Sequence, residues 1–213
     1  MSGAPLTLYG APGSGSVAVE AALTLIGLPY TRVDGATWAE PQARERVAPV
    51  NPMRQIPTLV LPDGEVMTES AAILIDLGDR YPAAGLAPAP GDAQRRQYLR
   101  WMVYVSSAIY ALHWIKPDVR RIGAPPEARD AVVDAVHARI AHCWAHMDRE
   151  LAPGRHLLGP ALSMLDLYVA VVSRFGPWRE RFRAAAPRMA PAVERVDDEP
   201  RLRALWRERF PPD

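Results

Sequence analysis

The chain has 213 residues, of which 49% are hydrophobic and 23% charged, proportions typical of a compact globular protein with a sizeable core and unlike those of a disordered chain. Its formal net charge of +1 excludes a bulk electrostatic attraction to nucleic acid or to an anionic membrane. The single cysteine, Cys143, excludes an internal disulfide framework, and no apolar stretch is long enough to span a membrane. The first residues show no signal segment, so we expect a cytoplasmic protein.

Short strands and helices alternate over the first third of the sequence. Residues 6–9 and 30–33 are predicted as strands, and residues 17–26 as a helix that Gly27 ends. A weaker helix is predicted over residues 38–47. Two further strands, 58–61 and 65–68, flank Asp63-Gly64, a pair that tolerates the positive φ of a tight hairpin turn. A helix then follows Ser70 and ends near residue 81.

A stretch rich in proline and glycine, residues 82–92, is predicted to link this region to one made of helices only. Asp92 can cap a long helix that reaches about residue 115. The apolar stripe along this helix consists of Leu99, Met102, Val103, Ser106 and Tyr110. Further helices are predicted over about residues 126–151, after Ser163 and, in shorter pieces, within 187–210. We therefore predict one domain over residues 1–81 and a second over 93–213.

Two short segments have the residues needed to bind a peptide-like ligand. In the first, Pro57 forces Ile56 into an extended conformation. We expect a cis bond between them, which would turn both backbone groups of Ile56 outward to pair with another backbone. In the second, Glu69 and Ser70 precede an apolar run at helical spacing, so a carboxylate and unpaired amides meet at a helix start. Such a start can hold an ammonium group and an anion. Glutathione, with its extended backbone and α-amino-acid end, has this chemistry.

Four segments resemble, in their order and spacing, the glutathione S-transferase superfamily. They are the loop and helix start at residues 8–16, the Gln55-Ile56-Pro57 run, the Glu69-Ser70 pair and the capping pattern at residues 163–166. The resemblance covers essentially the whole chain. It implies an α/β thioredoxin-like amino-terminal domain followed by an all-α carboxy-terminal domain. It also implies that glutathione is bound by Gln55, Ile56, Pro57, Glu69 and Ser70.

Glutathione reacts as the thiolate, so the site must lower the pKa of its thiol. Lowering a pKa of about 8.5 by about two units requires roughly 2.7 kcal/mol, which a helix amino terminus (~0.3–2 kcal/mol) and a charge-assisted hydrogen bond (~1.5–3 kcal/mol) supply together. We favour Ser14 as the donor, because counting back from Gly27 places it near the serine of serine-type members. Ser16 ranks second, unless it only caps the helix, and Tyr9 ranks third, unless it is only a strand aromatic.

The residues present disfavour other chemistry. Position 15 is glycine, so no loop cysteine can form a mixed disulfide with glutathione, and Cys143 is predicted to be a buried structural thiol. The loop also lacks the Ser-Ser-Cys run of zeta-class isomerases, which leaves the subclass open. His142, Cys143 and His146 fall within one helical turn, but ordinary helix packing explains them better than a metal does. No cofactor is expected beyond glutathione as a co-substrate.

The resemblance implies that the glutathione thiolate adds to a small, partly apolar electrophile, as in detoxification. Aromatic residues of the long helix that face the first domain are predicted to line the pocket for this second substrate. The candidates are Trp101, Tyr104, Tyr110 and Trp114. Two alternatives stay open: a glutathione-dependent isomerase or lyase, and a non-catalytic glutathione-binding module of the same fold.

The resemblance also implies a homodimer, because these transferases usually dimerise through the helix that follows residue 70 and the long helix after residue 92. The residues predicted to meet across that interface are Arg95, Arg96 and Arg100 on one side, and Asp76 and Asp79 on the other. The alternative is that the three arginines form a solvated helix face.

Overall fold

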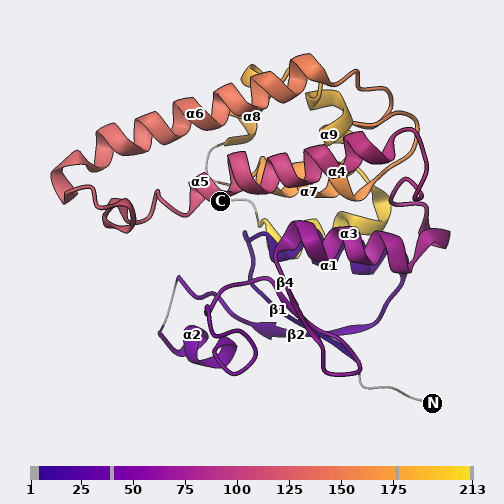
Figure 1. The fold of residues 1–213 in the computed structure, drawn as a ribbon, viewed down its shortest axis with the longest axis horizontal. Helices are drawn as coiled ribbons and strands as arrows, with labels where there is room; N and C mark the ends of the chain where they lie inside the picture. The colour runs from indigo at the N-terminus through magenta and orange to yellow at the C-terminus, as the bar shows by residue number, and fades with distance from the viewer. Residues whose placement is uncertain (1–4, 39–40, 176–177, 212–213) are drawn as a thin grey trace.

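The computed structural model describes residues 5–38, 41–175 and 178–211. Four strands near the start of the chain form one sheet in the order β2-β1-β3-β4 (Figure 1). β1 runs parallel to β2 and antiparallel to β3, and β4 runs antiparallel to β3. The strands are β1 (Leu6–Gly10), β2 (Tyr30–Asp34), β3 (Thr58–Val60) and β4 (Val66–Thr68).

Helices α1 (Ser16–Ile26) and α3 (Ser70–Arg80) lie between this sheet and the helices of the second domain (Figure 1). α2 (Pro41–Val47) lies on the side of the sheet that is farther from the second domain. β1 alternates buried and half-buried residues, and its buried Leu6 and Leu8 join the same apolar core as α1. The order of these elements confirms the predicted thioredoxin-like domain.

The regular elements of the described residues beyond position 81 are all helices. The longer ones are α4 (Arg95–Tyr104), α6 (Arg129–Glu150), α7 (Met164–Val172), α8 (Trp178–Ala185), α9 (Ala190–Asp197) and α10 (Arg203–Arg209). The shorter ones are a π-helical turn (Val105–Tyr110), α5 (Ala111–His113) and 3-10 turns at Pro82–Ala84, Val119–Ile122, Pro126–Ala128 and Pro200–Leu202.

The central helix α7 joins the two domains. Its residues are buried along its whole length, and it packs against both α1 and α3, so one continuous core spans the sheet and the helices. Its start confirms the predicted capping pattern: Asp166 accepts the Ser163 amide at 2.9 Å and the Ser163 hydroxyl at 2.5 Å. The same carboxylate accepts the Leu157 amide at 2.7 Å, which ties the preceding loop to the helix.

Three helical predictions need correction. The long helix predicted from residue 92 is interrupted after α4 by the π-helical turn. Val103, predicted in the apolar stripe, is 57% exposed, because Tyr98, Trp101 and Met102 form the buried face of α4 instead. The helix predicted over residues 38–47 begins at residue 41, and residues 39–40 lie outside the described residues. α8 is not predicted, although Trp178, Phe182 and Ala185 stand at helical spacing in the sequence.

Candidate functional site

Strand register brings the three predicted binding segments to one edge of the sheet. Thr58 pairs with Tyr9 on one side and with Thr68 on the other. The loop after β1, the loop before β3 and the turn after β4 therefore lie next to one another. α1 and α3 both begin at this edge, so two helix amino termini, with their partial positive charges, meet there.

The peptide bond between Ile56 and Pro57 is cis, as predicted. Pro57 is buried and Ile56 is half-buried. Neither the amide nor the carbonyl of Ile56 has a hydrogen-bond partner among the described residues. Both groups are therefore available to an extended backbone that lies along this edge of the sheet.

A buried asparagine, Asn51, holds the loop that leads to this bond. Its side-chain amide donates to the Gln55 carbonyl at 3.0 Å and to the Thr58 hydroxyl at 3.1 Å, and its side-chain oxygen accepts the Met53 amide at 3.0 Å. The Gln55 side chain itself is exposed. Sequence reasoning assigns Asn51 no role, although the turn-forming pair Asn51-Pro52 is a signal that points to it.

Glu69 and Ser70 lie at the start of α3, as predicted. Glu69 has a φ of 65°, in the left-handed region that residues other than glycine rarely adopt, and its side chain is exposed. Backbone conformations of this kind cluster at functional sites. Ser70 is 4% exposed, and its hydroxyl donates to the Tyr168 hydroxyl at 3.1 Å, so this hydroxyl is already engaged inside the protein.

The hydroxyls of Ser14 and Ser16 bond to each other and to their own loop. Ser16 Oγ accepts the Ala11 amide at 3.0 Å and lies 2.7 Å from Ser14 Oγ, which donates to the Ala11 carbonyl at 2.7 Å. Since each hydroxyl has one hydrogen, the arrangement in which Ser16 donates to Ser14, and Ser14 to Ala11, uses both. Ser14 Oγ also accepts the Ser16 amide at 3.2 Å. The N-cap position of α1 is Gly15, and Ser16 is the first residue of the helix, so neither serine is its cap.

Tyr9, the third candidate donor, lies on β1 and is half-buried. Because side chains alternate along a strand, Tyr9 lies on the opposite face of the sheet from its neighbour Leu8. The three candidate donors therefore have different surroundings: two serines enclosed in the loop at the start of α1, and a tyrosine on the strand before it. Their role toward a thiolate stays a prediction.

The aromatic residues predicted for the second-substrate pocket do not share one environment. Trp101 is fully buried, with its ring 5.3 Å from that of Tyr104. Tyr104 donates its hydroxyl to the carbonyl of Cys143 on α6 at 3.3 Å, and the thiol of Cys143 is fully buried, as predicted. Trp114 is 50% exposed. A pocket lined by all four residues stays a prediction.

The fourth of these residues, Tyr110, reaches the first domain. Its hydroxyl oxygen accepts the amide of Gly15 at 3.1 Å, at the start of α1. Its ring packs against those of Tyr168 at 6.2 Å and Phe175 at 5.2 Å. Burial raises the pKa of Tyr110 to about 12, so the phenol stays protonated at neutral pH. Since Tyr168 contacts Ser70, these two tyrosines connect the starts of α1 and α3.

The carboxy-terminal helix α10 also contributes to this edge. The Arg209 carbonyl accepts the Gly13 amide at 3.0 Å, and the Arg209 guanidinium donates to Glu20 Oε2 from Nε at 2.9 Å and from Nη2 at 2.8 Å. Glu20, on α1, is fully buried and also accepts the Tyr30 hydroxyl at 3.2 Å. Burial raises the pKa of Glu20 to about 7, and the positive charge of Arg32 and the Tyr30 hydrogen bond oppose this shift because they favour the ionised carboxylate. Glu20 and Arg209 are 189 positions apart, and no sequence pattern indicates the pair.

The structure corrects one expectation about the interface between subunits. Arg95 on α4 donates to both carboxylate oxygens of Asp79 on α3, each at 2.7 Å, so this pair forms within one chain. Asp76 pairs with Arg80 of its own helix at 2.8 Å. Arg96 is exposed. Arg95 and Asp79, which are predicted to meet across a subunit interface, therefore form their ion pair between two domains of one molecule.

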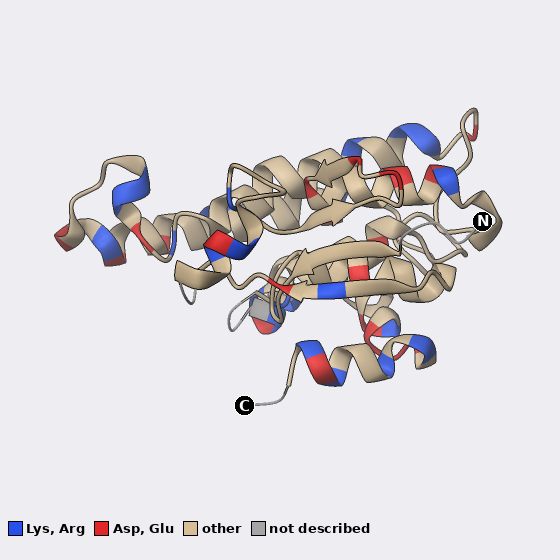
Figure 2. Cartoon of the chain, turned by 90° about the horizontal axis from the view of Figure 1, so that it is seen from below, with Lys and Arg blue, Asp and Glu red and all other residues tan. Residues whose placement is uncertain are grey.

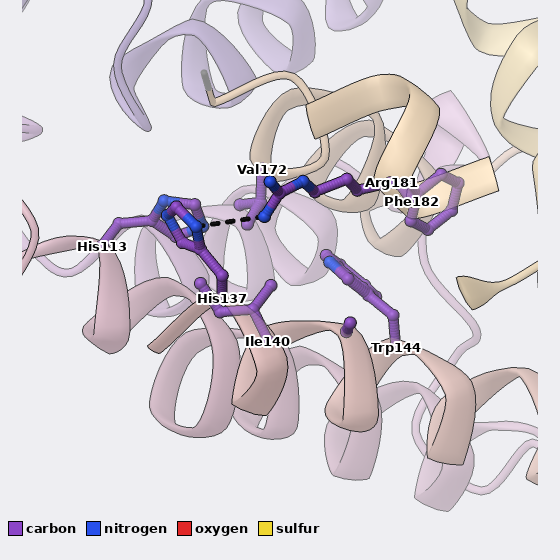
Figure 3. Close-up of a pocket in the computed structure, with 8 residues that line it drawn as sticks. His113, His137, Ile140, Trp144, Val172, Arg181 and Phe182 are labelled. Atoms are coloured by element: carbon purple, nitrogen blue, oxygen red, sulfur yellow. Dashed lines mark hydrogen bonds between the residues drawn. The ribbon is translucent and has the colours of Figure 1, made fainter. Parts of the chain in front are cut away.

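A small cavity lies among α5, α6, α7 and α8. Figure 3 shows His113 and His137 on one side of it and Arg181 on the other, with Arg181 Nη1 donating to His137 Nδ1 at 3.0 Å. Its volume is about 10 Å³, which is room for one water molecule. Burial lowers the pKa of His113 to about 3 and that of Lys116 to about 8. The cavity is too small for an organic substrate.

Charged and metal-binding residues are alternative candidates for a site, and neither kind forms one among the described residues (Figure 2). Figure 2 shows acidic and basic residues interspersed along the outer helices. Within residues 5–38, 41–175 and 178–211, no group of three or more His, Cys, Asp or Glu side chains could hold a metal ion. In the predicted helical trio, His142 is exposed and Cys143 is buried. In the part of the chain that the structure describes, no helix is long and apolar enough to cross a membrane.

Known proteins match the chain in sequence. The family model for the amino-terminal domain of glutathione S-transferases matches residues 16–80. YncG, an uncharacterized GST-like protein of Escherichia coli K12, is 30% identical over 203 residues, which cover 94% of this chain and 96% of YncG. Glutathione S-transferase GST-4.5 of Xanthomonas campestris is 27% identical over 80% of this chain and 82% of its own length.

Solved structures match the chain in fold. A glutathione transferase homologue from Sulfitobacter with bound glutathione has a TM-score of 0.82 at 26% identity, over 96% of this chain and 98% of that one. A sphingomonad glutathione S-transferase complexed with glutathione has a TM-score of 0.76 at 27% identity, over 97% of this chain and 100% of that one. The similarity to YncG in sequence and to the Sulfitobacter homologue in fold extends over nearly the whole length of this chain and of each of those proteins. The chain therefore belongs to the glutathione S-transferase superfamily.

Proposed function

We propose that the protein binds glutathione and activates it as a thiolate for addition to a small, partly apolar electrophile. The observation that carries this proposal is the meeting of three features at one sheet edge: the backbone of Ile56, which has no hydrogen-bond partner within the described residues, the Glu69-Ser70 start of α3 and the start of α1. Each feature suits a different part of glutathione. The bound glutathione in two structurally similar relatives supports the same ligand here.

The γ-glutamyl end of glutathione would lie at the start of α3. There the Glu69 carboxylate takes the ammonium group, and the amide of Ser70 faces the carboxylate. The cysteinyl backbone pairs with the amide and carbonyl of Ile56, next to the buried Pro57. The exposed side chain of Gln55 adds a further polar contact. Held in this way, the cysteinyl sulfur lies toward the start of α1.

The start of α1 would stabilise the thiolate. A helix amino terminus (~0.3–2 kcal/mol) and one charge-assisted hydrogen bond (~1.5–3 kcal/mol) together lower the thiol pKa by about two units. Ser14, Ser16 and Tyr9 are the first-domain hydroxyls proposed for that bond. Either serine must exchange a hydrogen bond of the loop for one to the sulfur. The thiol proton passes to solvent, and the sulfur then forms a bond to the electrophile, which is held beside it.

Isothermal titration calorimetry with glutathione tests the proposal. Replacing Glu69 by Ala should weaken binding by about 1.5–3 kcal/mol, or roughly 10- to 150-fold, because a charged hydrogen bond is lost. Glu65→Ala is the matched control, since Glu65 is also exposed but lies in the hairpin before β4. Equal affinity of Glu69→Ala and wild type, with the fold intact, refutes the assignment of Glu69. A wild-type protein that does not bind glutathione refutes the proposed function.

Turnover distinguishes transfer from the alternatives. A transferase consumes free thiol when it is given glutathione and a panel of apolar electrophiles. An isomerase or lyase changes its substrate while the amount of free thiol stays constant, because the thiolate is regenerated. A non-catalytic binding module binds glutathione and leaves every substrate unchanged.

We further propose that the protein forms a homodimer through α3 and α4 and acts in detoxification. Val103 on α4, which is 57% exposed, provides apolar surface on one of these helices. Sedimentation equilibrium measures the mass of the particle in solution. A mass equal to that of one chain at every concentration tested contradicts the homodimer.

A further inference from the structure

A tyrosine from the helical domain lies where the thiolate is proposed to form. Tyr110 Oη accepts the amide of Gly15 at 3.1 Å, so the hydroxyl lies at the first residues of α1. Because its oxygen is the acceptor in this bond, its own hydrogen is free to point elsewhere. No acceptor for that hydrogen is found among the described residues. The hydroxyl is therefore a donor without an acceptor, held at a helix start that attracts an anion.

Gly15 makes this close approach possible. A Cβ atom at that position would lie 2.4 Å from Tyr110 Oη, so any other residue would displace the hydroxyl. The conformation of Gly15 does not itself need glycine, since its φ is −63° and its ψ is −17°. Glycine fits this position because the Tyr110 hydroxyl occupies the space that a Cβ atom would take, and not because the backbone conformation requires it.

The helix that carries Tyr110 departs from α-helical geometry just before it. Residues Val105–Tyr110 form a π-helical turn between α4 and α5, although neither proline nor glycine occurs within it. Such turns are rare and are frequent at functional sites. This one ends at Tyr110, whose ring then packs against Tyr168 and Phe175. The turn and the ring contacts together fix where the hydroxyl lies.

The serines of the loop are less suited to the same task. The hydrogens of Ser14 and Ser16 are both used in bonds within the loop, to each other and to Ala11. Donation from either serine to a sulfur breaks one of these bonds, whereas donation from Tyr110 breaks none. This difference favours the tyrosine, because a donor that is already in place costs no reorganisation when charge develops.

We propose that Tyr110 is the residue that donates a hydrogen bond to the sulfur of glutathione. The inference rests on the proposed function and deepens it. Tyr110 keeps its own hydrogen throughout, and the proton of the thiol passes to solvent. The thiolate is then held between two domains, by the start of α1 on one side and by the phenol from the end of the π-helical turn on the other.

The test is the thiolate absorbance of protein-bound glutathione, titrated against pH, in wild type and in Tyr110→Phe. The pKa of bound glutathione should rise by about one to two units in the variant, because a charged hydrogen bond is lost. Tyr98→Phe is the matched control: it removes a hydroxyl from α4 that is fully buried and has no partner among the described residues. Its titration should match wild type. Calorimetry at a pH where the thiol is protonated should give similar affinities for all three proteins.

Gly15→Ala provides a second perturbation that leaves Tyr110 in the chain. Its Cβ should displace the hydroxyl and raise the pKa of bound glutathione as Tyr110→Phe does, and the double variant should show little further shift. If wild type binds glutathione but both single variants titrate like wild type, this inference is overturned and the proposed function stands. A shift in Ser14→Ala without one in Tyr110→Phe also overturns it. A wild-type protein that does not bind glutathione overturns both.

Discussion

The buried pair of Arg209 and Glu20 leads to a specific prediction about stability. The side chains are 7% and 0% exposed, and two N–H groups of the guanidinium donate to Glu20 Oε2. Arg209→Met keeps an apolar side chain of similar reach but removes both donors. The carboxylate is then left in the core with the Tyr30 hydroxyl, at 3.2 Å, as its remaining partner among the described residues. We expect the free energy of unfolding to fall by about 3–5 kcal/mol at a pH of about 8.5, where the wild-type carboxyl is ionised.

This loss of stability should depend on pH. Burial raises the pKa of the Glu20 carboxyl from 4.5 to about 7. The folded protein therefore holds a proton on Glu20 between these two values that the unfolded chain has released, and loss of the guanidinium raises the upper value further in the variant. Stability therefore falls as the pH rises through this window. Wild type shares this loss up to about pH 7, where its own carboxyl ionises, so the deficit of the variant relative to wild type should be smallest at about pH 5 and should grow as the pH rises above about 7.

Urea unfolding followed by circular dichroism, at about pH 5 and about pH 8.5, measures both effects. Glu208→Ala is the matched control, because Glu208 also contacts Arg209, at 3.0 Å, but is 63% exposed. It should cost less than about 1 kcal/mol, as exposed ion pairs do. The reasoning about the buried charge is refuted if Arg209→Met unfolds within about 1 kcal/mol of wild type at the higher pH. A deficit that does not shrink at the lower pH refutes the argument about Glu20 protonation.

Two further predictions concern the supports of the site and of the core. Asn51→Ala should cost about 1–3 kcal/mol of stability and also weaken glutathione binding, because the Gln55 carbonyl and the Thr58 hydroxyl lose a donor. Calorimetry and urea unfolding measure the two effects, and full affinity in a destabilised variant would contradict the role of Asn51 in the binding loop. Ser163→Ala should cost about 0.5–2 kcal/mol, because Asp166 loses its contact with the hydroxyl, while glutathione affinity stays unchanged. A variant as stable as wild type in urea would show that this cap is dispensable.

Features that depend on residues close together in the chain could be predicted from the sequence. The helix end at Gly27 and the hairpin turn at Gly64 both have the positive φ that the sequence indicates, 83° and 88°. The capping contacts between Ser163 and Asp166 span three positions. The order of these elements predicts the thioredoxin-like first domain, because local sterics and short hydrogen bonds decide them. The two-domain architecture and the roles of the candidate site segments are predicted from the resemblance to the glutathione S-transferase superfamily.

The tertiary structure alone decided how distant residues meet. Tyr110 and Gly15 are 95 positions apart, and their contact depends on a π-helical turn that no sequence pattern indicates. The pairing of Arg95 with Asp79 within one chain likewise depends on how α4 packs on α3. Hydrophobic periodicity indicates which face of a helix is buried, but not which element covers it or at what rotation. The proposed choice of Tyr110 as donor to the sulfur depends on that rotation and on which hydroxyl hydrogens are already used, and both are properties of the packed molecule.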